Sequence, residues 1–420
     1  MGTAIIGQHI VARRVRSLSI ALVIVLISSV LSGQQPKRKT QPYVAPLLPA
    51  EQAWKVALPA PPSAGAVMDD RTVYVPLGDA ARAADEESCT PASLIALARD
   101  TGEPRWTSFV PSCFPPVLTH GIIAVATGHE IQALEPKNGL RLWSVTLERP
   151  VRAPMVATGS LLLAMLEGDE LFGIDVEKRA VAWRRSVGES GPLRMTADDR
   201  AAYVATNAGR VTRVELSDGE IGWERPLSGE LSEPVVDGDR LFVGSNSKPP
   251  FFWSLDVQTG KDRARPWRGR VFGGAVVGSA VKGNRVFVVS QDNIVRALNR
   301  GNSNQQWSKA AGARPLFPPR VLEGIVVVIG SAPALSTFRA DNGAAVSTWA
   351  APADALLQGP PLIDRPRPLA VSIVVVFRDG QVFGLRSAEM MLKEPALAPF
   401  TALPGRVLSR ETLSVDPAAR

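Results

Sequence analysis

Histidine and cysteine are scarce in this chain. Its 420 residues include three histidines, His9, His120 and His129, and two cysteines, Cys89 and Cys113. No histidine stands near another residue at a spacing that would bind a metal ion or build a catalytic triad. The sequence therefore predicts no catalytic residue and no metal site.

A long apolar segment is also missing. The longest run, "LSIALVIVLISSVL" at 18–31, is short for a membrane span; basic residues precede it and small residues follow it. Residues 1–33 are predicted to be a signal peptide, with cleavage near Ser32 or Gly33 favoured, or an uncleaved anchor in the inner membrane. Gln34 stands where a lipoprotein signal would have cysteine, so no lipid anchor is expected. We expect a periplasmic or other extracytoplasmic location, with residues 34–49 as a polar, proline-rich linker.

Most of the chain carries almost no net positive charge. The formal charge is +7, but residues 1–40 contain six Lys and Arg residues and no acid, which leaves about +1 for the rest. Because a basic surface drives nucleic-acid binding, the composition argues against a nucleic-acid partner.

A repeated sequence motif fills the remainder of the chain. "LEPKNGLRLW", "VELSDGEIGW" and "LDVQTGKDRARPW" each run from an apolar strand through a turn to a tryptophan. Together with the β-branched runs upstream, each unit predicts four strands, the third and fourth joined by a tight turn. The apolar residue before the turn recurs eight times, 37 to 47 residues apart, at Leu97, Leu134, Ile174, Val214, Leu255, Leu298, Phe338 and Leu385. Such a period is typical of a closed ring of small units.

Tryptophan marks the end of the units. We expect these side chains to pack against neighbouring units, at Trp54, Trp106, Trp143, Trp183, Trp223, Trp267, Trp307 and Trp349. The last unit lacks a downstream tryptophan, whereas Trp54 lacks upstream strands, so the N-terminal strand can complete the last sheet. The fold class predicted is all-β: an eight-bladed β-propeller of four-stranded blades over residues 50–390, closed by the N-terminal strand, with 391–420 as a C-terminal tail. We expect a monomer.

These motifs resemble the PQQ-like repeat of quinoprotein-like propellers, and the chain is most similar to the periplasmic propeller family of the outer-membrane assembly machinery (BamB type). The resemblance implies a noncatalytic scaffold that binds a protein partner in envelope assembly. The alternatives are a PQQ-dependent dehydrogenase and a ligand-sensing ectodomain on a membrane anchor.

Quinone-dependent enzymes share only the scaffold. They are longer, bind calcium and the quinone in loops, and often carry an adjacent Cys-Cys disulfide, which this chain lacks. We therefore expect no cofactor, neither PQQ nor calcium. The acids before the turns, Glu135, Asp175, Glu215 and Asp256, are interpreted as capping groups for backbone amides.

Two loops depart from the regular pattern. Cys89 and Cys113 fall in loops on the same face of the first blade, so they are predicted to form a disulfide; the alternative is a pair of free thiols. In the fifth blade, a candidate partner-binding patch combines residue types enriched at interfaces: Phe251, Phe252, Arg263, Arg265, Arg268 and Arg270. The alternative there is a solvated basic hairpin with the phenylalanines partly packed.

Overall fold

The computed structural model describes residues 49–78, 93–112, 114–188, 193–263, 270–322, 324–331, 334–352, 354–364 and 371–388. All of these lie in one compact unit that spans residues 45–420. The predicted signal segment, the linker up to residue 48, the C-terminal tail and the Cys89–Cys113 pair lie outside the described residues. Among the residues described, no helix is both long and apolar enough to cross a membrane.

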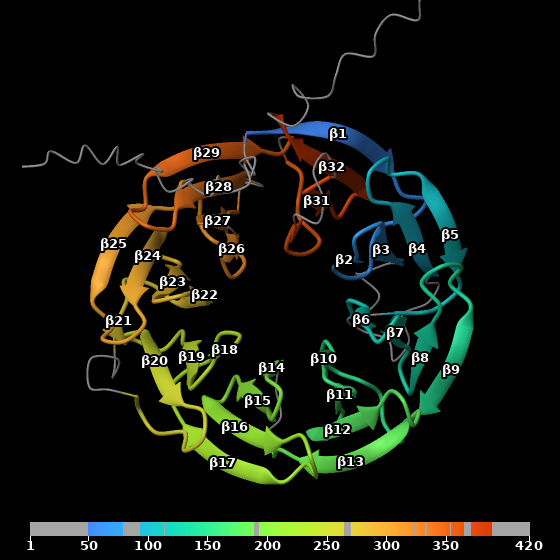
Figure 1. Cartoon of the computed structure of the whole chain (residues 1–420), viewed down its shortest axis with the longest axis horizontal. Coiled ribbons are helices and arrows are strands. Elements are labelled where there is room, and N and C mark those ends of the chain that lie inside the picture. The colour runs from blue at the N-terminus through green and yellow to red at the C-terminus, as the bar shows by residue number, and fades with distance from the viewer. Residues whose placement is uncertain are drawn as a thin grey trace, which may run out of the picture. The chain divides into compact units, whose positions relative to one another are not determined.

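Every element is a strand, and the strands form eight four-stranded sheets arranged as blades around a ring (Figure 1). Blade 1 contains β2 (Val67–Met68), β3 (Thr72–Leu77), β4 (Ser93–Ala98) and β5 (Pro104–Ser108). Blade 2 contains β6 (Val117–Thr119), β7 (Ile122–Ala126), β8 (Glu130–Leu134) and β9 (Arg141–Thr146). Blade 3 contains β10 (Val156–Thr158), β11 (Leu161–Leu166), β12 (Glu170–Asp175) and β13 (Ala180–Ser186). Blade 4 contains β14 (Leu193–Ala197), β15 (Ala201–Thr206), β16 (Arg210–Glu215) and β17 (Ile221–Pro226).

The second half of the ring repeats this plan. Blade 5 contains β18 (Val235–Asp237), β19 (Arg240–Gly244), β20 (Phe251–Asp256) and β21 (Arg270–Val271). Blade 6 contains β22 (Val276–Lys282), β23 (Arg285–Ser290), β24 (Ile294–Asn299) and β25 (Gln305–Ala310). Blade 7 contains β26 (Arg320–Leu322), β27 (Ile325–Ile329), β28 (Ala334–Arg339) and β29 (Ala345–Ala350). Blade 8 contains β30 (Leu362–Ile363), β31 (Ile373–Val376) and β32 (Gln381–Ser387), and β1 (Ala50–Ala57) is its outer strand. The predicted fold class is confirmed.

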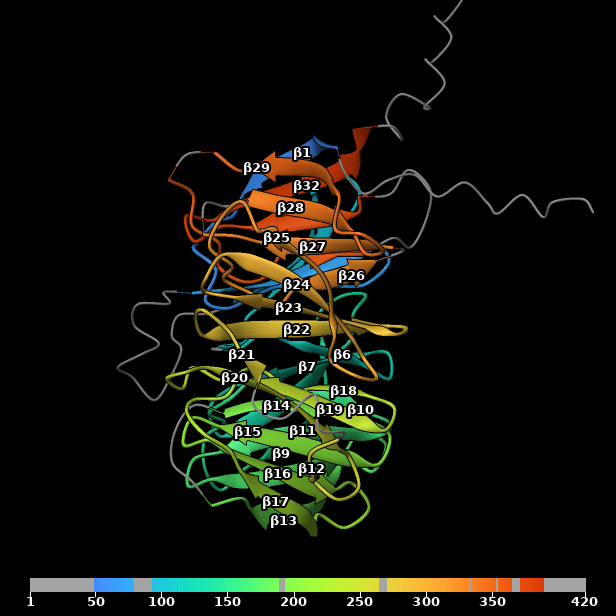
Figure 2. The ribbon, with the colours of Figure 1, turned by 90° about the vertical axis from the view of Figure 1, so that its left-hand side faces the viewer.

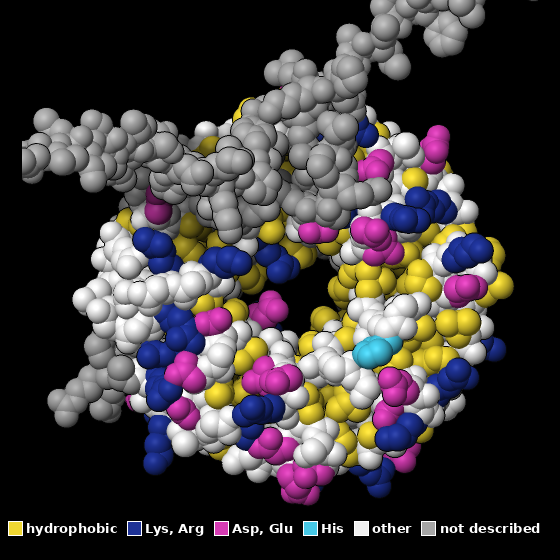
Figure 3. Space-filling view, viewed as in Figure 1, with side chains coloured by type: hydrophobic (Ala, Val, Ile, Leu, Met, Phe, Trp, Pro, Cys, Tyr) yellow, Lys and Arg dark blue, Asp and Glu magenta, His cyan; other side chains and the backbone are white. Residues whose placement is uncertain are grey.

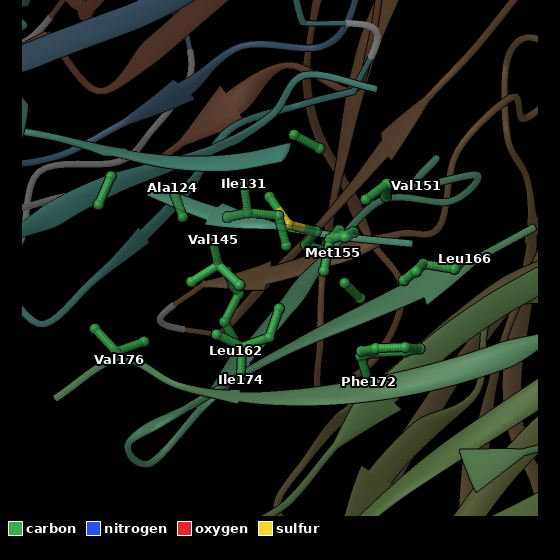
Figure 4. Packing of buried hydrophobic residues seen from close by; sticks show 14 of the residues in the cluster. Ala124, Ile131, Val145, Val151, Met155, Leu162, Leu166, Phe172, Ile174 and Val176 are labelled. Atoms are coloured by element: carbon green, nitrogen blue, oxygen red, sulfur yellow. The ribbon is translucent and has the colours of Figure 1, made fainter. Parts of the chain in front are cut away.

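The core is divided among the junctions between blades. The residues described form eight clusters of buried hydrophobic side chains, and each joins two neighbouring blades. In the cluster between blades 2 and 3, for example, Ile131 packs in the same group as Leu162 and Phe172 (Figure 4). Because the second and third strands bury both of their faces, they read as continuous apolar runs. The recurrent residue at the end of each third strand is at most 5% exposed, as its periodicity predicts.

Tryptophan side chains connect successive blades. Trp183 of blade 3 donates a hydrogen bond from Nε1 to the carbonyl of Leu216 in blade 4, at 2.8 Å. Its ring lies over Gly219, where a Cβ would come within 2.6 Å of the indole. The same arrangement recurs at Trp54–Gly102, Trp106–Gly139, Trp223–Gly260 and Trp307–Gly343. The prediction that these tryptophans pack against the neighbouring blade is confirmed; Trp267 lies outside the described residues.

Trp349 departs from this pattern. In the hairpins of blades 1 to 4 and 6 the tryptophan stands opposite the residue before a β-bulge, as Trp307 stands opposite Ala297. In blade 7 Ser347 occupies that position, and Trp349 pairs with Leu335. The next blade explains the difference. Its third and fourth strands come from opposite ends of the chain, so no hairpin turn is present to receive an indole. Trp349 instead packs, partly buried, against the core between blades 7 and 8.

The ring closes through pairing of the first and last strands. β1 runs antiparallel to β32, with Ala50 opposite Ser387 and Trp54 opposite Gly384. Trp54 then reaches over Gly102 of blade 1 and donates to the carbonyl of Arg99 at 2.8 Å. The expected N-terminal closure is therefore present.

Arg99 reinforces the closure from within. Its side chain is fully buried; Nε donates to the carbonyl of Val371 at 2.8 Å, and Nη1 to a carboxylate oxygen of Asp364 at 3.2 Å. Both acceptors belong to blade 8. A buried guanidinium with this many partners fixes the position of the first blade against the last.

Candidate functional site

The ring has two faces, and in the side view the loops and turns project from it on opposite sides (Figure 2). The loop face carries the connections between blades and the loops between second and third strands. The turn face carries the other hairpin turns. Since Ala50 pairs with Ser387 at the start of β1 and the end of β32, both ends of the propeller leave from the turn face.

Exposed apolar side chains mark the loop face. Phe109, Leu316 and Leu356 are 93%, 47% and 58% exposed, and each stands in a connection between blades. The other large exposed hydrophobics of the described residues lie on outer strands or, for Leu140, directly before one: Leu140, Leu142, Val181, Ile221 and Val346. Exposed Leu and Phe side chains on one face indicate a surface suited to contact with another protein.

Connections between blades are held in place. Isolated bridges tie five of them, including those of Leu316 and Leu356, to the end of the second strand of the blade that follows: Pro62–Leu77, Val151–Leu166, Leu231–Ser245, Pro315–Gly330 and Leu357–Phe377. The connection that carries Phe109 is held instead by a hydrogen bond from the Ser63 hydroxyl to the carbonyl of Ser112, at 2.9 Å. The backbone N–H of Leu316 also donates to the carbonyl of Ile329 at 3.0 Å. A loop fixed in this way loses little further entropy when it binds a partner.

A cavity of about 640 Å³ opens on the loop face between blades 4 to 7, and we call it the channel-mouth groove. Its walls include Asn246, Gln291 and the segment Arg314–Pro318. A second cavity of about 780 Å³ follows the central channel and has mainly apolar walls. Glu233, Phe317 and Pro318 line both, so the groove continues into the channel. Figure 3 shows hydrophobic side chains around the central opening of the ring.

Most charges at the groove are paired. Arg194 lies 3.2 Å from a carboxylate oxygen of Glu230, whose other oxygen accepts a hydrogen bond from Asn246 at 2.8 Å. Arg314 differs, because its Nη2 donates to the neutral amide oxygen of Gln291 at 2.8 Å. Among the described residues, no carboxylate forms an ion pair with Arg314.

Glu233 contributes an acid at the entrance to the channel. Its side chain is open to the water of the channel, but the surrounding walls remove part of its solvation, and this raises the pKa of the carboxyl. Arg320 and Arg194 act in the opposite direction without cancelling the effect.

The structure corrects the predicted patch in blade 5. Phe252, predicted as part of a partner-binding surface, is fully buried between Phe242 and Phe272, because it stands in a third strand whose two faces are both covered. Phe251 is half-buried and contacts Trp253.

Arg263 is the one arginine of that patch whose side chain the structure describes, and it lies away from the phenylalanines. Arg263 forms ion pairs with Asp239 and Asp256 at the turn-face end of β20, whereas Phe251 begins the strand at its other end. The backbone of Arg270 pairs with that of Phe252 where β21 runs beside β20. The side chain of Arg270, with Arg265 and Arg268, lies outside the described residues.

The acids before the turns behave as predicted at two positions. Asp175 accepts backbone hydrogen bonds from Glu177 and Lys178, and Asp256 accepts them from Gln258 and Thr259. The hydrogen bond from the Lys178 backbone lowers the pKa of Asp175, as expected for a capping carboxylate. In the part of the chain that the structure describes, no three His, Cys, Asp or Glu side chains are grouped to bind a metal ion.

Comparison with known proteins identifies the fold family. The family model described as "Outer membrane protein assembly factor BamB" matches residues 48–189, 90–308, 229–352 and 255–389, which together span the whole ring. The chain belongs to this family. The overlapping matches follow from the repeat, since one blade resembles the next.

Individual members of the family are distant in sequence. An outer membrane protein assembly factor BamB from Bordetella pertussis is 26% identical over 307 residues, covering 68% of this chain and 75% of that protein. One from Yersinia pestis is 24% identical, covering 63% and 74%. The crystal structure of BamB from Moraxella catarrhalis covers 81% of this chain and 98% of its own with a TM-score of 0.56; at 15% identity it supports the fold alone.

Sequence reasoning missed the groove. Arg314, Leu316 and Phe317 lie in "ARPLFPPR", where arginines bracket an apolar, proline-rich run. This composition is the signal that could have singled them out. The other residues that line the groove come from blades 4, 5 and 6, and nothing in the local sequence indicates that proximity.

Proposed function

We propose that this chain is a noncatalytic, extracytoplasmic scaffold of outer-membrane assembly that holds a protein partner on its loop face. Membership of the BamB family supports the role in outer-membrane assembly. The observation that carries the choice of face is the exposure of Phe109, Leu316 and Leu356 on connections that bridges or hydrogen bonds hold to the blades. The N-terminal segment acts in export, and the propeller works without PQQ or calcium.

Photocrosslinking in the native envelope tests the choice of face. A photoreactive amino acid is placed at position 109, 316 or 356, and, as matched controls on outer strands, at 142 or 346. We expect the loop-face positions to give one discrete adduct with a protein of the assembly machinery and the controls to give none. Adducts from the outer strands alone would show that the partner binds the circumference instead.

A cofactor titration tests the noncatalytic assignment. PQQ with calcium is added to the purified chain and the quinone absorbance is followed. The proposal predicts no saturable change, whereas a stoichiometric shift would favour the dehydrogenase alternative.

A further inference from the structure

The channel-mouth groove has the chemistry of a peptide site. Leu316 is 47% exposed and Phe317 is half-buried beside it, so the groove offers an apolar surface next to the channel. Prolines at 315, 318 and 319 restrict the backbone of this segment. The surface is therefore preformed, and binding does not have to order it.

The polar part of the groove presents donors. Arg314 uses one N–H group on the side-chain oxygen of Gln291, and both residues are exposed, so the other guanidinium donors and the Gln291 amide group are accessible. Asn246 accepts a hydrogen bond from the backbone N–H of Glu230 and donates one to the Glu230 carboxylate. The groups that remain next to Leu316 are thus hydrogen-bond donors, one of them the cationic guanidinium of Arg314, and a carboxylate is the acceptor that matches a guanidinium best.

The remaining charges of the groove do not alter this preference. Arg194 is neutralised by Glu230, and the charge of Arg320 interacts with that of Glu233 at the channel entrance. Arg314 is left as the cation without a counter-ion among the described residues that line the groove. The groove continues into the channel, so the site is elongated and suits an extended peptide chain.

We propose that the channel-mouth groove binds an extended acidic segment of the protein partner, with a carboxylate on Arg314 and an adjacent apolar side chain against Leu316 and Phe317. This inference rests on the proposed function, and it names the part of the loop face and the chemistry of the segment that binds there.

A charge-swap experiment with defined peptides tests the proposal. The full purified chain is titrated by fluorescence anisotropy with a labelled peptide in which two glutamates bracket a Leu-Phe pair, and with versions carrying lysine for glutamate or serine for Leu-Phe. We expect the acidic apolar peptide to bind at least about fivefold more tightly than either of the others.

Variants of the chain complete the test. Arg314→Glu should reverse the preference between the acidic and basic peptides, and Leu316→Ser should weaken both. Arg285→Glu is the matched control, since Arg285 also donates to a neutral glutamine, Gln306 at 2.6 Å, but lies on the turn face. It should leave the preference unchanged. Circular dichroism establishes that each variant is folded. If Arg314→Glu does not fold, Arg314→Gln replaces it and should remove the preference for the acidic peptide.

Two results would overturn the proposal: equal affinity of the unaltered chain for the acidic and basic peptides, or the same effect from Arg314→Glu and Arg285→Glu. Crosslinking from positions 109, 316 and 356 is independent of these peptides. If it still captures the partner, the groove assignment alone is wrong; if it also fails, the proposed function is wrong.

Discussion

Single residues in this propeller act mainly across the junction to the next blade. The pairing of an indole with a turn glycine shows why the repeat retains both at a fixed spacing. At Gly219 two constraints coincide, because φ is +75° and a Cβ would collide with Trp183. A substitution can separate these constraints.

Gly219→Ala should destabilise the fold by about 3 kcal/mol or more, because the unfavourable backbone conformation and the displaced indole add. Gly121→Ala is the matched control: φ is +71° and no atom lies within 4 Å of the added Cβ, so only the backbone cost of roughly 1–2 kcal/mol remains. Urea denaturation of both variants measures the difference. Equal losses would show that the indole contact contributes nothing.

The raised pKa of Glu233 predicts that the stability of the fold depends on pH. Because folding raises the pKa of this carboxyl, its ionisation destabilises the folded state as the pH rises above the ordinary carboxyl range, about 4.3. Glu233→Gln removes that penalty, so its stability relative to the unaltered chain should increase between about pH 4 and pH 7.

Asp341→Asn provides a control of opposite sign for this measurement. The hydrogen bond from Arg339 lowers the pKa of Asp341, so its carboxylate stabilises the fold above the ordinary carboxyl pKa and loses that effect as the pH falls. Relative to the unaltered chain, this variant should lose stability as the pH rises towards about 4 and then change little up to about pH 7. Parallel trends in the two variants would contradict both assignments.

At the scale of elements, blade 8 differs from the others because no covalent connection links its third strand, β32, to its fourth, β1. The contacts of blade 8 with itself and with blade 1 therefore close the ring. Strand pairing, Trp54 and the buried Arg99 hold it together. Arg300 is the residue equivalent to Arg99 in blade 6; it forms ion pairs with Asp237 and Asp239 of blade 5, but 21% of its side chain is exposed.

Arg99→Ala should cost about 3 kcal/mol, because it leaves the buried carbonyl of Val371 without its donor and opens a cavity, whereas the half-exposed Asp364 can be solvated. Arg300→Ala should cost less, roughly 1–2 kcal/mol, because water can replace part of its interactions. Chemical denaturation compares the two. A larger loss at Arg300 would mean that the closure does not depend on the buried guanidinium.

For the whole molecule, closure by strand pairing can be tested by circular permutation. Two permutants join residue 388 to residue 49 through a short turn. One opens the blade 4 hairpin between Ser217 and Asp218. Its blade 4 is then assembled from three strands at one end of the chain and one strand at the other, as blade 8 is in the unpermuted ring. The other opens the connection between Ser228 and Gly229, which leaves whole blades at both ends.

The first permutant should melt at nearly the temperature of the unpermuted ring, and the second at a clearly lower temperature, because no backbone hydrogen bonds cross its closure. Differential scanning calorimetry gives both values. Identical melting temperatures would show that side-chain packing between blades is sufficient for closure.

The repeat made the fold predictable from the sequence, whereas the site depended on features that the repeat does not contain. Val214 and its seven equivalents could be placed in the core because burial of a strand and the spacing of its turn are local properties. Phe252 was misplaced because an aromatic residue after a loop can belong to the loop or to the strand, and only the register of β20 distinguishes them. Arg99 gave no local signal of burial, since its acceptors in blade 8 are more than 260 residues away in the sequence.

The sequence by itself determined the architecture: the number of blades, four strands in each, the tryptophan contacts and the closure by the first strand. These follow from short-range patterns that recur about every 40 residues. Only the tertiary structure decided which connections stand together on the loop face and which charges remain unpaired there. Arg314, Gln291 and Asn246 meet because curvature of the ring brings three blades around one channel mouth. That proximity is a property of the closed ring, and no single repeat encodes it.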